Sequence, residues 1–258
     1  MTSPASGDAS RPPSSRWRLL GVVAPALDAR TGVFGMRHRR TMAGAEVDAC
    51  TGMLRALPGA VAAWSDGNVE IDAEVVVAER PLARLARDGG GWWADPGAAA
   101  DLLEPHLASP RDSILLLYPS DGDPALRGAW GYTWGEVAFL GGAGFSAIVS
   151  DPWPGWATIE DPAHGFVHEW LHQVEAVYRR LGVPEDDLPG LHDVADRRTT
   201  RADAPDRDET YAEHERRTGS WRPWYRDYMT GTVGPKSGEA PRLRGLTRER
   251  WLLRPNPA

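Results

Sequence analysis

The feature that most constrains the fold is an amphipathic helix predicted over residues 162–181. Asp161 and Pro162 suit its start, as an N-cap residue and a proline at the first helical position. Gly182 and Pro184 suit its end. At about 100° per residue, one side of the helix is apolar and carries Trp170, Val174, Val177 and Leu181. An apolar stripe of this kind must be buried against another element, so we expect the helix to pack on a sheet.

The opposite side of this helix carries His168 and His172, the first and last residues of the pentad His-Glu-Trp-Leu-His at 168–172. His168 and His172 are four residues apart, so they lie on one face, one helical turn apart. Two imidazoles placed in this way can bind one Zn²⁺, and Glu169 can then act as a general base toward water. We therefore predict His168 and His172 as metal ligands and Glu169 as a catalytic residue.

The segments before this helix predict alternating strands and helices. Apolar and alternating runs predict strands over 17–24, 69–77, 113–118, 136–140 and 145–149. Residues 41–64 have helical spacing, and 97–107 could form a short helix. Two strands, at 136–140 and 145–149, are separated by the glycine-rich segment 141–144, which we interpret as a turn.

This order of elements together with the pentad resembles the zincin metallopeptidases, over about residues 17–182. The resemblance implies an α+β fold, in which a mixed twisted sheet of about five strands packs on two helices, one of them the active-site helix. It also implies that an edge strand pairs with an extended peptide substrate. Residues 136–140 are the candidate edge, and an ordinary core hairpin is the alternative interpretation. Three regions are expected: a disordered tail over 1–15, the zincin-like subdomain over 16–182, and a smaller C-terminal subdomain over 183–258.

The third metal ligand is expected after the helix, because the chain departs from the metzincin pattern. That pattern would place glycine at 175 and histidine at 178, where this chain has Glu175 and Tyr178. His192 is the predicted ligand, since neutral imidazole is the commoner choice, and Asp193 is the alternative. His214 is a third possibility. Residues 182–191 can span about 33 Å when extended, which is enough for the chain to return to the metal.

Two tyrosines are candidates for stabilising charge in the transition state. Tyr228, followed by Met229 and Gly231, resembles the methionine turn that underlies the metal in metzincins, where a nearby tyrosine can stabilise the oxyanion. We predict that Tyr228 has this role, with Tyr225 as the alternative donor. The other interpretation is an aromatic cluster that packs the C-terminal subdomain.

Composition restricts the partners. The 258 residues carry a net charge of −7 and show no basic block interleaved with aromatics, so we expect no nucleic-acid partner. No stretch approaches the roughly 18 apolar residues of a membrane span, so no membrane partner is expected. The single cysteine, Cys50, excludes an internal disulfide and is expected to be a small core residue. A cytoplasmic location is expected, with secretion as the less favoured alternative.

These observations predict a zinc-dependent metallohydrolase, most simply a metallopeptidase acting on peptides or proteins. One alternative is a non-haem Fe²⁺ oxygenase or tailoring enzyme, in which Asp193 completes a facial triad with the two histidines of the pentad. A second alternative is a non-catalytic module that binds peptides at the edge strand.

Overall fold

The computed structural model describes residues 15–32, 34–88, 91–123, 126, 132–133, 138–150, 159–184, 187–188, 191, 222–233 and 244–254. These residues divide into two compact units. The sheet unit comprises Trp17–Pro58 and Asp72–Gln173. The C-terminal unit comprises Gly59–Ile71 and the described residues from Val174 onward, together with the start of the first strand.

A five-stranded sheet in the order β4-β1-β7-β9-β8 organises the sheet unit. Its strands are β1 (Ser15–Val23), β4 (Val69–Val77), β7 (Ser113–Tyr118), β8 (Tyr132–Thr133) and β9 (Gly144–Val149). The first four strands in the order are parallel, and β8 pairs antiparallel with β9 at the edge. Every residue of β7 and β9 is buried, as expected for parallel strands that are covered on both faces.

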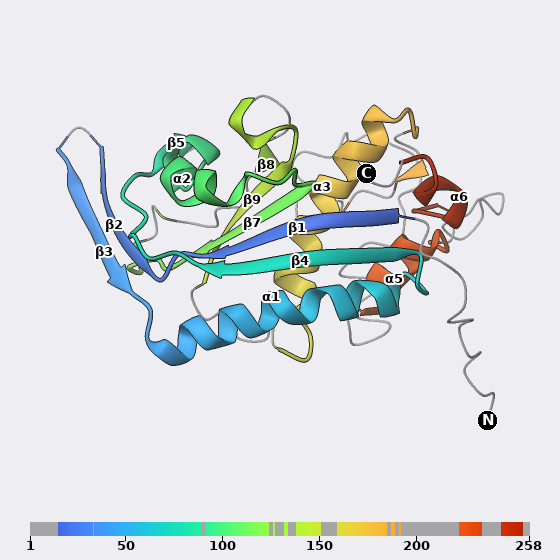
Figure 1. Ribbon diagram of the computed structural model, residues 1–258, viewed down its shortest axis with the longest axis horizontal. Coiled ribbons are helices and arrows are strands. Elements are labelled where there is room, and N and C mark those ends of the chain that lie inside the picture. The colour runs from blue at the N-terminus through green and yellow to red at the C-terminus, as the bar shows by residue number, and fades with distance from the viewer. Residues whose placement is uncertain are drawn as a thin grey trace, which may run out of the picture. The chain divides into compact units, whose positions relative to one another are not determined.

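Two helices, α1 (Gly44–Trp64) and α3 (His168–Arg180), pack on the same face of this sheet. On β1, Gly21 lies against Leu54 of α1, and Trp17 meets Trp170 of α3 edge-to-face with ring centroids 5.7 Å apart. Positions 17 and 21 of a strand point to one side. Figure 1 shows α1 running alongside β4 and β1.

The opposite face of the sheet packs against α2 (Pro96–Leu103). Leu20 and Val22 of β1 share one core cluster with Leu102 and Leu103 of the helix. Asp95 caps α2, since its side chain accepts a hydrogen bond from the backbone N–H of Ala98 at 2.6 Å. The sheet is therefore covered on both sides, which gives a mixed α/β architecture.

Two hairpins were not predicted from the sequence. The first joins β2 (Ala26–Thr31) to β3 (Met36–Thr41), and the second joins β5 (Ala86–Asp88) to β6 (Gly91–Trp93). Strand β3 reads Met-Arg-His-Arg-Arg-Thr, so it lacks the apolar alternation on which the strand predictions relied.

The predicted strands at 69–77 and 113–118 are confirmed to the residue, and the helix predicted over 41–64 is confirmed as α1. The strand predicted at 136–140 is wrong where it can be compared, because Ala138–Leu140 forms a 3₁₀ turn. Residues 136 and 137 lie outside the described ranges. The edge of the sheet beside β9 is instead formed by β8. This strand has only two residues, which is too few to show a periodic pattern in the sequence.

In the C-terminal unit, the end of α3 packs with α5 (Arg222–Thr230) and α6 (Arg248–Trp251). The rings of Tyr178 and Trp251 meet edge-to-face at 5.3 Å, and the Trp251 indole N–H donates to the carbonyl of Met229 at 2.9 Å. Tyr225 stacks on Trp64 with ring centroids 6.2 Å apart. No helix in the described ranges has both the length and the apolar content needed to cross a bilayer.

Candidate metal centre

The pentad lies at the start of α3, directly after one π-helical turn, Ala163–Val167. The sequence predicted a single helix from Pro162, and the structure differs in this first turn only. The backbone N–H groups of Phe166 and Val167 both lie close to the carbonyl of Pro162, at 3.2 and 3.4 Å. Turns of this kind occur often at functional sites.

The two histidines of the pentad converge on one point. Their Nε2 atoms are 3.0 Å apart, and their rings are nearly perpendicular, with an interplanar angle of 87°. Two nitrogens bound to one tetrahedral Zn²⁺ would be about 3.3 Å apart. His168 is half-buried and His172 is buried, so His172 is held by the fold while His168 has partial access to solvent. The donor set and the spacing of these nitrogens are those of a group that could hold a metal ion.

Glu169 completes the cluster. One ligand atom from each of His168, Glu169 and His172 lies within 4.8 Å of the others. The Glu169 side chain is 2 % exposed, and its Oε1 has no hydrogen-bond partner among the described residues. Burial raises the pKa of this carboxyl group to about 8. A cation held by the neighbouring imidazoles would favour the ionised form, because opposite charges stabilise each other.

Gln173, next to His172, anchors α3 to the sheet. Its side-chain amide donates to the carbonyl of Ile114 at 3.1 Å and to the hydroxyl of Ser146 at 2.9 Å. The sequence analysis did not single out Gln173. The available signal was a polar residue on the otherwise apolar side of the helix, where a buried amide needs partners. Because Gln173 fixes the helix on β7 and β9, it also fixes the residue before it.

Gly144 of β9 leaves the space that Gln173 occupies. A Cβ atom at position 144 would lie 2.7 Å from the Gln173 Oε1 and 2.9 Å from its Cβ and Cγ. We predict that Gly144→Ala lowers the free energy of unfolding by about 1–3 kcal/mol and weakens metal binding, as measured by chemical denaturation and zinc titration. Gly59→Ala is the control, since nothing lies within 4 Å of a Cβ there. Equal stability of the two variants would contradict this account of the helix anchor.

The structure brings together three of the predicted site residues, His168, Glu169 and His172. The candidates for the third ligand, His192, Asp193 and His214, lie outside the described residues, so each remains a prediction.

Tyr228, the predicted oxyanion donor, lies on α5 in the C-terminal unit and is fully buried. Its hydroxyl donates to Oε1 of Glu175 at 2.9 Å. Burial, and then the charge of Glu175, raise the pKa of Tyr228 well above its usual value, so the hydroxyl keeps its proton and remains a donor. A catalytic role for Tyr228 stays a prediction. The alternative donor, Tyr225, is buried against Trp64.

Cys50 is a buried residue of α1, as expected, with 4 % of its surface exposed. Burial raises the pKa of its thiol to about 11, and the nearby charge of Glu46 adds to this effect. About one thiol in a thousand is then ionised at pH 8. We predict that iodoacetamide leaves the native protein unmodified at this pH and alkylates it fully after unfolding in guanidinium. Rapid alkylation of the native protein, detected by mass spectrometry, would show that Cys50 is not a core residue.

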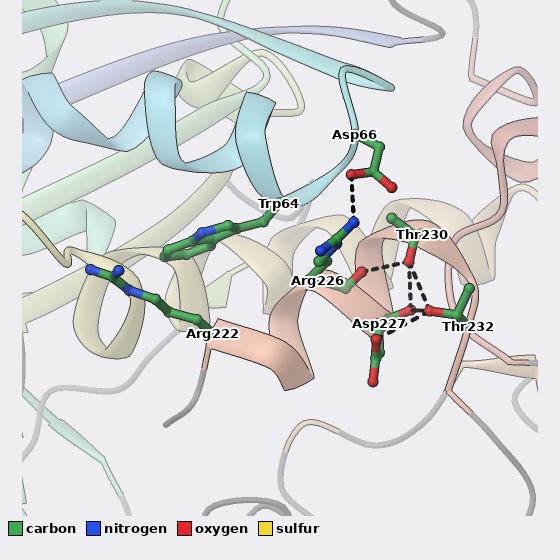
Figure 2. Close-up of a pocket in the computed structure, with 7 residues that line it drawn as sticks. All are labelled: Trp64, Asp66, Arg222, Arg226, Asp227, Thr230 and Thr232. Atoms are coloured by element: carbon green, nitrogen blue, oxygen red, sulfur yellow. Dashed lines mark hydrogen bonds and ion pairs between the residues drawn. The ribbon is translucent and has the colours of Figure 1, made fainter. Parts of the chain in front are cut away.

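A pocket of about 480 Å³ lies within the C-terminal unit (Figure 2). It is lined by Trp64, Asp66, Arg222, Arg226, Asp227, Thr230 and Thr232. Arg226 pairs with Asp66 at 3.3 Å, and both side chains are more than half exposed. Two arginines are balanced by two aspartates, so the charge of the lining selects neither an anion nor a cation.

No protein-family model, curated protein or solved structure matches the chain.

Proposed function

We propose that the protein is a metal-dependent hydrolase, most simply a zinc metallopeptidase. The observation that carries the proposal is the convergence of the His168 and His172 Nε2 atoms, 3.0 Å apart, beside the buried carboxyl group of Glu169. These two histidines would hold the metal, with His192 as the third ligand or Asp193 in its place. The remaining coordination position of a catalytic zinc site is open to water or substrate.

The architecture of the sheet unit supports a zincin-like assignment. The resemblance implied a mixed sheet of about five strands on two helices, and the sheet unit has five strands with α1 and α3 on one face. An antiparallel edge strand is also present, although it is β8 rather than residues 136–140. We propose that this edge accepts an extended peptide by strand addition.

The two histidines and Glu169 have separate roles in the proposed hydrolysis. When bound, zinc supplies a Lewis acid that lowers the pKa of water and polarises a carbonyl group. The imidazoles of His168 and His172 would hold and position the metal. His172 is kept in place by the buried helix that Gln173 anchors. The carboxylate of Glu169 accepts a proton from the attacking water and later returns it to the nitrogen of the leaving amine. Burial of Glu169 limits exchange of this proton with bulk solvent.

Hydrolysis of a peptide library by the zinc-loaded protein tests this proposal. We expect cleavage products by mass spectrometry, loss of cleavage after chelation, and recovery when zinc is added back. The His106→Ala protein should cleave the library as the wild type does, because this half-buried histidine lies outside the cluster. Stoichiometric iron in anaerobically purified protein, without peptide cleavage, would favour the oxygenase alternative. Peptide binding without turnover would favour the non-catalytic module.

A further inference from the structure

The β2–β3 hairpin, which we call the arm (Ala26–Thr41), extends beyond the end of the five-stranded sheet (Figure 1). Its two faces differ. Leu27, Ala29 and His38 point inward and are at most 1 % exposed. The other face is charged and carries Asp28, Arg30, Arg37 and Arg39.

The arm is held firmly at its inner face. His38 lies between Thr31 and Asp121, with its Nε2 2.7 Å from the threonine hydroxyl and its Nδ1 3.0 Å from the carboxylate. Near the base, the backbone N–H of Asp28 donates to the carbonyl of Leu82 at 3.0 Å. Because these contacts are on one face only, the outer face and the tip are left open to solvent.

The tip of the arm exposes large apolar side chains. Phe34 is 101 % exposed and Met36 is 55 % exposed. Near the tip, the guanidinium of Arg30 donates to the carbonyl of Gly35 at 3.1 Å. An exposed aromatic ring at the end of a projecting hairpin contributes nothing to the core, and exposed apolar side chains that gather in one place are typical of interaction sites.

The outer face is basic, although the chain as a whole carries a net charge of −7. Asp28 pairs with Arg37 at 2.6 Å, and its side-chain hydrogen bond to Arg37 lowers the pKa of Asp28. Since one aspartate stands against three arginines, this face keeps a net charge of +2. The arm is therefore complementary to an anionic surface, which the protein's overall charge would otherwise repel.

We propose that the arm docks on anionic lipid membranes, with Phe34 and Met36 entering the interfacial layer and the arginines contacting lipid phosphates. An apolar tip bordered by cations matches the apolar acyl chains and the anionic headgroups of that interface. Nucleic acid could bind the arginines through its phosphates and stack a base on Phe34, but it offers no apolar layer that would take up Phe34 and Met36 together. A second copy joined through β3 would bring arginines against arginines. The expectation of no membrane partner came from the absence of a spanning segment, which surface docking does not need.

Flotation of the full chain with vesicles tests the proposal. We expect binding to phosphatidylcholine vesicles that contain about 30 % phosphatidylserine, weak binding to phosphatidylcholine alone, and release at high salt. The double variant Arg30→Glu/Arg39→Glu should lower the partition coefficient at least about 25-fold, which is about fivefold per arginine. Phe34→Ser should lower it about tenfold.

Two control variants outside the arm show whether the effects of charge reversal and of apolar side-chain removal on vesicle binding are specific to the arm. Arg55→Glu/Arg87→Glu makes the same charge change at exposed positions outside the arm, and Leu252→Ser removes a side chain that is 60 % exposed. Both should bind as the wild type does. The proposal is overturned if anionic vesicles are not bound, if the control double variant loses binding equally, or if duplex DNA is bound in preference to vesicles. Circular dichroism of each variant shows whether it is folded.

Discussion

Replacing Glu169 by glutamine should lower peptide hydrolysis by about 10²- to 10⁴-fold, the range that general acid–base groups contribute. Glutamine has nearly the same size and fits the same buried position, but it cannot accept a proton from water. Because Glu169 is a neighbour of the two imidazoles and not one of the predicted ligands, zinc binding should remain. The measurement is kcat for a cleaved library peptide, together with the zinc content of the same sample.

Glu79→Gln provides the matched control, since Glu79 is exposed and lies outside the cluster. Its activity should equal that of the wild type. Undiminished hydrolysis by the Glu169→Gln protein would exclude Glu169 as the general base and would end the peptidase assignment.

Replacing His172 by alanine should remove both zinc and activity. The Nε2 atom of His172 is one of the two that converge. Without it, His168 and the proposed third ligand, His192 or Asp193, would be left to hold the metal. Loss of an outer partner of a metal ligand already costs about 10- to 100-fold in affinity, so loss of a ligand should cost more. Competition with a fluorescent chelator measures the change.

His106→Ala controls for the removal of a histidine elsewhere in the sheet unit and should leave zinc affinity unchanged. If the His172→Ala protein bound zinc as tightly as the wild type, the metal would have to lie outside the pentad.

The segments predicted correctly from the sequence are those whose burial is regular. Residues 113–118 form a continuous apolar run because β7 is covered on both faces, and 69–74 alternate because the start of β4 is buried on one side only. Helix α3 was predicted from its caps and its two faces, and only its π-helical first turn was missed.

The segments that were missed owe their structure to distant contacts. Strand β3 is mostly polar, and it forms because β2 offers a ladder and His38 is held by Asp121, 83 residues away. Strand β8 has only two residues and exists because β9 lies beside it. Local periodicity carries no information about either pairing.

The candidate site was partly predictable for a geometric reason. A spacing of four residues fixes two side chains on one helical face, so the meeting of His168 and His172 follows from the sequence. The anchor made by Gln173 did not follow, because it needs the backbone of Ile114 and the hydroxyl of Ser146. A third ligand after the helix depends on the path of the chain, and spacing alone leaves His192 and Asp193 as alternatives.

Zinc titration of the chelated protein, with peptide hydrolysis as the readout, tests the central claim most directly. The account predicts that activity rises in proportion to added zinc up to one equivalent per chain and then stays constant. Hydrolysis that is independent of zinc, or a protein that binds one equivalent and cleaves no peptide, would contradict it.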